Sequence, residues 1–182
     1  MNSGRVAIRY AKGLLKFSNE RGVSLDLYKD AFSLIQILKE SKSLNDLMGN
    51  PSIESSEKFK ILEKTLSDKI HPYFIEFLRM VVLRRRFEHA LNALYLFRDL
   101  YRKQNDIVEV QVESVDQLSD SELKEIESFV QKKFNKKTEM STIIKPQLIA
   151  GYIVIVEGKI MDFSVSGQLA SFQKNLGLSV AN

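Results

Sequence analysis

The sequence predicts a mainly α-helical fold in two parts: an N-terminal six-helix bundle over residues 1–104, then a small α+β domain over residues 105–182 with a mostly antiparallel sheet. In the first part, apolar residues recur every three or four positions, which is typical of amphipathic helices. Near Asn105 this period changes to two, which is typical of strands. The charge balance also changes sign, because residues 1–103 hold 19 Lys and Arg against 12 Asp and Glu, whereas residues 104–182 hold 8 against 11.

Six helices are expected before residue 105, each from an apolar stripe and from the residues at its ends. The first stripe is expected to end at Gly22, a typical C-terminal cap. Ser24 is expected to cap the second helix, whose stripe runs from Tyr28 to Leu38. The other four helices are expected over residues 44–48, from Ser55 or Ser56 to near residue 71, over 73–83 and over about 87–104.

The pattern after residue 105 predicts a strand, a helix, three strands and a last helix. Val108, Val110 and Val112 alternate with polar residues, so a half-buried strand is expected there. Ser119 and Glu122 have the spacing of a capping box, which predicts the start of the helix. The later strands are expected over residues 138–145, 152–156 and 159–162, and the last helix over about 165–177.

The composition offers few groups for catalysis or for metal binding. The chain has no Cys, which excludes disulfides, thiolate metal sites and cysteine nucleophiles. It also lacks a glycine-rich phosphate loop and the HExxH and GxSxG motifs. The two histidines, His71 and His89, are expected to be structural or solvated. We therefore predict no catalytic residue, no cofactor and no metal site.

No membrane-spanning segment is expected. The uncharged run over residues 146–156 is eleven residues long, whereas a spanning helix needs about 20. The first 17 residues alternate basic and apolar side chains and do not have the pattern of a signal peptide. A cytoplasmic location is therefore the default expectation.

A row of basic residues lies on one face of the first predicted helix, because Arg5, Arg9, Lys12 and Lys16 are spaced by three or four positions. This row fits the solvated side of an amphipathic helix, and it also fits a surface for an anionic membrane or a nucleic acid. A basic nucleic-acid-binding protein with an α+β appendage is therefore the alternative function. Arg84, Arg85 and Arg86, between the fifth and sixth helices, are expected to be solvated at a helix end.

Two features of the helical part are consistent either with internal packing or with a bound partner. Gly13 lies mid-helix, where Gly costs about 1 kcal/mol relative to Ala, so another helix is expected to approach it closely. The fifth helix has two apolar stripes, one of Phe74, Leu78 and Val81 and one of Tyr73, Phe77 and Met80. The approaching helix belongs to the same bundle or to a partner that docks across the first and fifth helices.

Several short motifs follow one another along almost the whole chain. Arg9-Tyr10-Ala11-Lys12 lies in the first helix, Asn50-Pro51 precedes the fourth, and Arg86 follows the fifth. The most specific stretches are PQLIAG over residues 146–151, IMDFSV over 160–165 and GQL over 167–169. By the order and spacing of these motifs the sequence resembles the delta subunit of the F-type ATP synthase, known in mitochondria as the oligomycin sensitivity conferral protein.

The resemblance implies a non-catalytic peripheral-stalk subunit, a stator that links the alpha/beta catalytic head to the membrane-anchored b-subunit stalk and resists rotor torque. In that family the six-helix domain binds the N-terminal region of an alpha subunit in a groove between its first and fifth helices. The C-terminal domain holds the C-terminal region of the b subunit. The resemblance further implies a peripheral location at the cytoplasmic face of the inner membrane, with no nucleic acid as partner.

Site residues are carried over by position. The groove would be lined by Tyr10, Gly13, Glu76 and Met80. The late motifs carry over as residues expected to be structural, namely Pro146, Gly151, Asp162, Ser164 and Leu169. The sequence departs from the family at Gly13, where a small residue such as Ala is usual, and at Arg85, where Gly is common.

Overall fold

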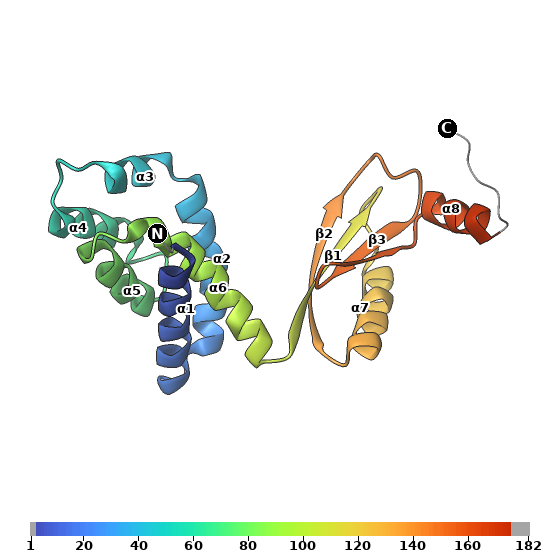
Figure 1. Cartoon of the computed structure of the whole chain (residues 1–182), viewed down its shortest axis with the longest axis horizontal. Helices are drawn as coiled ribbons and strands as arrows, with labels where there is room; N and C mark the ends of the chain where they lie inside the picture. Colours follow the sequence, from blue (N-terminus) through green and yellow to red (C-terminus); the bar gives the residue numbers. More distant parts are fainter. Residues whose placement is uncertain (1–2, 176–182) are drawn as a thin grey trace. The chain divides into compact units, whose positions relative to one another are not determined.

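The computed structural model describes residues 3–175, and its contacts divide the chain into two units that meet between Gln104 and Asn105 (Figure 1). The protein is mainly helical, with one four-stranded sheet in the second unit. No helix in the described range is long and apolar enough to cross a membrane.

The first unit consists of helices joined by short turns. Its helices are α1 (Ser3–Glu20), α2 (Ser24–Glu40), α3 (Lys42–Gly49), α4 (Ser55–Leu66), α5 (Pro72–Leu83) and α6 (Ala90–Gln104), with a short 3₁₀ helix, η1 (Phe87–His89), before α6. Gly22 follows α1 with φ of 69°, and the N–H of Val23 donates to the carbonyl of Ser18 at 3.0 Å, which is a Schellman C-cap. Ser24, expected to cap α2, instead lies inside the helix, and Val23 occupies the N-cap position without a side-chain hydrogen bond.

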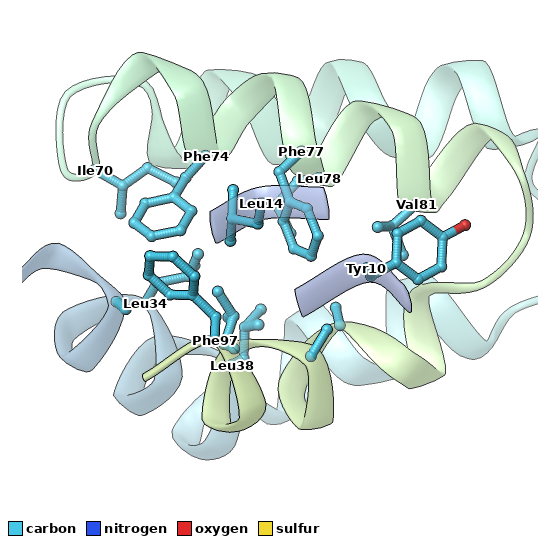
Figure 2. Packing of buried hydrophobic residues seen from close by; sticks show 14 of the residues in the cluster. Tyr10, Leu14, Leu34, Leu38, Ile70, Phe74, Phe77, Leu78, Val81 and Phe97 are labelled. Atoms are coloured by element: carbon cyan, nitrogen blue, oxygen red, sulfur yellow. The ribbon is translucent and has the colours of Figure 1, made fainter. Parts of the chain in front are cut away.

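The core of the first unit is formed by buried side chains from all six helices. Phe74 of α5 and Phe97 of α6 are fully buried, and their rings meet edge to face with centroids 6.5 Å apart (Figure 2). Small Ala7 and Ala11 on α1 are buried, and α1 is in extensive contact with α6. Burial of this apolar surface is the main force that holds the helices together.

The end of α6 is attached to α1 and α2 by polar contacts. Arg102 is buried and donates from Nε to the hydroxyl of Tyr28 at 2.8 Å, and the Tyr28 ring stacks on that of Tyr101. Gln104 exchanges side-chain hydrogen bonds with Asn19 at 3.0 and 3.3 Å. Buried polar groups are stable only when they are paired, and the Arg102–Tyr28 bond satisfies that condition.

The second unit has its four strands in the order β2-β1-β3-β4, with two helices. The elements are β1 (Ile107–Ser114), α7 (Asp120–Phe134), β2 (Lys137–Ile144), β3 (Tyr152–Val156), β4 (Lys159–Asp162) and α8 (Val165–Asn175). β1 pairs with β2 in parallel and with β3 antiparallel, and β3 pairs with β4 antiparallel. The expectation of a mostly antiparallel sheet is therefore wrong, because the helix between β1 and β2 returns the chain to the same end of the sheet and makes that pair parallel.

One face of the sheet packs against α7. Val108, Val110 and Val112 of β1 are buried there, with Ile126 and Val130 of α7 in the same cluster. The predicted capping box is present, because the N–H of Glu122 donates to Ser119 Oγ and the N–H of Ser119 donates to Glu122 Oε2 at 2.8 Å. Hydrogen bonds from Ser119 lower the pKa of the Glu122 carboxyl, which remains charged at the positive end of the helix.

Candidate partner-binding surfaces

Aromatic contacts join α1 to α5. The ring of Tyr10 meets that of Phe77 edge to face at 6.2 Å, and the ring of Phe17 meets that of Tyr73 edge to face at 5.0 Å. A later residue of α1 thus contacts an earlier residue of α5. The four residues carried over from the family lie on these two adjacent helices, and we call Tyr10, Gly13, Glu76 and Met80 the α1–α5 face.

Tyr10 is almost fully buried, with 8% of its surface exposed. Figure 2 shows its ring beside Val81 of α5. Its hydroxyl is inaccessible to solvent and has no hydrogen-bond partner in the part of the chain that the structure describes. A buried hydroxyl without a partner costs about 1–3 kcal/mol.

We expect Tyr10→Phe to stabilise the first unit by about 1 kcal/mol, because the substitution removes the unpaired hydroxyl and keeps the ring against Phe77. Urea denaturation followed by circular dichroism measures the change. Tyr95→Phe is the matched control, since the Tyr95 side chain is 39% exposed on α6. A loss of stability in Tyr10→Phe would mean that the hydroxyl has a partner.

The other three residues of the α1–α5 face are exposed. A Cβ added to Gly13 would have no heavy atom within 4 Å outside its own helix backbone and chain neighbours, so no other helix of this unit packs on it. The interpretation of Gly13 as an internal contact is therefore wrong. Met80 is 39% exposed and Glu76 lies one turn before it on the same side of α5.

The two stripes of α5 have different environments. Phe74, Leu78 and Val81 are fully buried in the core. In the second stripe Phe77 is buried and Tyr73 is half-buried, both against rings of α1, whereas Met80 is exposed. The second stripe thus packs partly on α1 and leaves apolar surface at its C-terminal end.

The backbone conformation of the turn after α5 explains why Gly is favoured at the position of Arg85. This residue has φ of 56°, in the left-handed region that favours Gly. The N–H of Arg86 donates to the carbonyl of Val81 and the N–H of Arg85 to that of Val82, both at 2.9 Å, which is a Schellman motif. Arg84, Arg85 and Arg86 are all exposed, as expected for a solvated helix end.

In the second unit, Gly151 lies where two backbone segments approach closely. Its φ is 85°, and an added Cβ would lie 2.5 Å from the carbonyl oxygen of Phe163 and 2.9 Å from the Cα of Ser164. Hydrogen bonds on both sides hold this approach, from the N–H of Phe163 to the carbonyl of Tyr152 and from the N–H of Val165 to that of Ala150. Only glycine fits this position without a shift of backbone.

Asp162 and Ser164 order the chain that enters α8. Asp162 Oδ1 accepts from the N–H of Ser164 at 2.8 Å, and Ser164 Oγ accepts from the N–H of Gly167 at 3.0 Å, as in an N-cap. Hydrogen bonds from the Ser164 side chain and backbone lower the pKa of the Asp162 carboxyl, so this contribution to stability is present at neutral pH and is lost as the pH falls through the folded-state pKa. Pro146 is exposed in the loop after β2, and Leu169 is 59% exposed on α8.

Sequence analysis missed a buried carboxylate in the sheet. Glu113 of β1 is 6% exposed, and its Oε1 accepts from Lys145 Nζ at 2.7 Å and from Gln111 Nε2 at 2.8 Å. A Glu at an outer position of a half-buried strand is expected to be exposed. Its burial could not be predicted, because its partner Lys145 lies 32 positions later in the sequence. Lys145 and Gln111 thus supply the partners that a buried carboxylate needs.

Exposed apolar side chains beside ordered helices are typical of subunits that bind other proteins. Over residues 6–176 the sequence matches the ATP synthase delta (OSCP) subunit family. It is 29% identical to the ATP synthase subunit delta of Symbiobacterium thermophilum, covering 97% of this chain and 95% of that protein, and 30% identical to that of Prochlorococcus marinus, covering 94% and 93%.

A similar fold occurs in the cryo-EM structure of the Toxoplasma gondii mitochondrial ATP synthase hexamer. The TM-score is 0.68 at 20% identity, with 96% of this chain and 98% of that chain covered. The chain belongs to the ATP synthase delta (OSCP) subunit family. It is a peripheral-stalk subunit of an ATP synthase, structural and not catalytic, and the comparisons give no support to the nucleic-acid alternative.

Proposed function

We propose that the first unit acts as a six-helix bundle that binds the N-terminal region of the alpha subunit, and that the second unit binds the C-terminal region of the b subunit. The observation that carries the first half is the α1–α5 face. It places an uncovered glycine on α1 beside an α5 that keeps Met80 and Leu83 exposed. An amphipathic partner helix laid over Gly13 would bury this apolar surface.

The charged residues around this face indicate which charges the partner helix should carry. Arg9 and Lys16 lie one turn before and one turn after Gly13 and are exposed, whereas Glu76 is exposed on α5. A partner helix with acidic residues on the side of α1 and a basic residue near Glu76 would match both helices. Such rim charges mainly steer encounter and set the orientation of the helix.

The two attachments would give the chain a mechanical role. The rotor applies torque to the head, and the head stays fixed only if a second connection to the membrane sector resists that torque. The chain would supply one link of that connection at the cytoplasmic face of the inner membrane. Binding free energy at each end does this work, because the link fails at whichever attachment dissociates first.

The test is to titrate the full chain with a synthetic peptide of the alpha-subunit N-terminal region and, separately, with a soluble C-terminal fragment of the b subunit, both from the same organism. We expect saturable binding of each, and unchanged affinity for one when the other is already bound. Competition between the two would contradict a division of the sites between the units. Failure of either to bind would remove that partner from the proposal.

A further inference from the structure

The register of the strands sorts the side chains of the sheet onto two faces. Val110 and Val112 of β1 lie opposite Val156 and Val154 of β3, and these valines belong to the core under α7. On the other face Gln111 lies opposite Ile155, and Ile155 lies opposite Ile160 of β4. We call this second side the open sheet face, formed by Glu109, Gln111, Glu113, Glu139, Ser141, Ile143, Ile153, Ile155, Ile160 and Asp162.

The isoleucines of the open sheet face lack the cover that the valines have. Ile160 is 68% exposed and Ile143 is 42% exposed, whereas Ile153 and Ile155 are half-buried. None of these four belongs to the hydrophobic core cluster that the structure describes for this unit. Figure 1 shows α8 beside the strands and not across them.

The apolar part of this face is continuous and has an acidic border. Ile155 pairs directly with Ile160, and Ile153 lies two positions away on β3, so the three side chains form one patch. Carboxylates of Glu113 and Asp162 lie on either side of Ile153, and Glu109 lies opposite Glu139 farther along the sheet. The basic groups at this face are Lys137 and Lys145, at the two ends of the β2 register, and Lys145 is paired with Glu113.

Side chains on the outer face of a sheet that is exposed to water are usually polar. Here β-branched apolar residues occupy both outer positions of β3 and one of the two in β4, and carboxylates outnumber ammonium groups around them. The second unit as a whole also has a net negative charge, with 8 Lys and Arg against 11 Asp and Glu over residues 104–182. The chemistry that matches this surface is an apolar stripe flanked by cations.

We propose that the open sheet face is the surface on which the second unit holds the stalk, and that its occupant is an amphipathic helix whose apolar stripe is flanked by Lys or Arg. The proposal rests on the proposed function, which gives the stalk to this unit. It adds the face and the chemistry of the partner. The isoleucine patch supplies the apolar contact, and the net negative charge around the patch attracts the basic flanks.

The experiment uses the full chain and a soluble C-terminal fragment of the b subunit as the probe. Ile160→Lys places a cation at the most exposed side chain of the isoleucine patch, and at 68% exposure the side chain contributes little to folding. We expect the affinity to fall at least tenfold. Ile149→Lys is the matched control, since Ile149 is 80% exposed in the loop after β2, outside the face, and we expect its affinity to equal that of the wild type.

A charge reversal tests the second half of the proposal. Glu109→Lys should weaken binding severalfold and reduce its dependence on salt, because it makes the charge of the open sheet face less negative by two and so weakens the long-range attraction for a basic partner. Thermal melts of every variant establish that the second unit remains folded.

Three results would overturn the proposal. If the wild type binds the fragment and Ile160→Lys binds equally well, the face is wrong while the proposed function stands, and loss of binding in Leu169→Lys would then place the contact on α8. If the wild type itself fails to bind, the stalk attachment is wrong and this proposal falls with it. If sedimentation shows a dimer of this chain that Ile160→Lys dissociates, the occupant is a second copy.

Discussion

Gly151→Ala is expected to destabilise the second unit by about 3 kcal/mol or more. Two costs add at this position. The φ of 85° lies in a region that costs an L-residue about 1–3 kcal/mol. The new methyl would also lie 2.5 Å from the carbonyl oxygen of Phe163, a backbone atom that two flanking hydrogen bonds hold in place. Urea denaturation followed by circular dichroism measures the loss.

Gly158→Ala separates the two costs. Gly158 lies in the turn between β3 and β4 with φ of 76°, and an added Cβ there has no heavy atom within 4 Å. This variant has only the conformational cost, so we expect the free energy of unfolding to fall by about 1 kcal/mol. Equal losses in the two variants would show that the close approach to Phe163 contributes nothing, and that the backbone there can move.

The helical part was the more predictable half because its signals are local. Stripes at a spacing of three and four give each helix, and Gly22 marks the end of α1 through a backbone conformation that its own residue type favours. The exact start of α2 was less predictable. Ser24 is a good capping residue, but the Val23 N–H is already bonded to Ser18 in the cap of α1, so the next helix begins one residue earlier than expected.

The sheet was less predictable because strand pairing is not local. The sequence shows where β1 and β3 lie, since Val108 to Val112 alternate and Tyr152 to Val156 is a β-branched run. It does not show the order of the strands in the sheet. The 15-residue helix α7 between β1 and β2 is the signal that was available, because such a crossover makes parallel neighbours.

The candidate site was found in parts for similar reasons. Gly13 could be singled out because glycine in the middle of a helix has a known cost, and the open space around it argues against a contact with another helix of the same unit. The open sheet face was missed because β3 is apolar at every position. A strand such as Ile153-Val154-Ile155 predicts burial on both sides, and only the register shows that one side has no cover from α7.

Gly13→Asp is expected to lower the affinity for the alpha-subunit N-terminal peptide by about 100-fold, or about 3 kcal/mol. If the partner helix packs over Gly13, the substitution removes that contact and buries a carboxylate without a partner in an apolar interface. Isothermal titration of the full-length variant with the peptide measures the loss. Gly13→Ala should retain most of the affinity, since a small residue such as Ala is usual at this position in the family.

The free protein should tolerate the same substitution. Gly13 is exposed, Asp has a slightly better helix propensity than Gly, and Arg9 and Lys16 lie within one turn of the new carboxylate, so the melting temperature should be unchanged or slightly higher. Gly4→Asp is the control, because Gly4 is nine positions away, on the opposite side of α1, and also has open space around it. We expect its affinity to match the wild type. A folded Gly13→Asp variant with undiminished affinity would remove Gly13 from the site, and an unfolded one would mean that a helix of the same unit covers it.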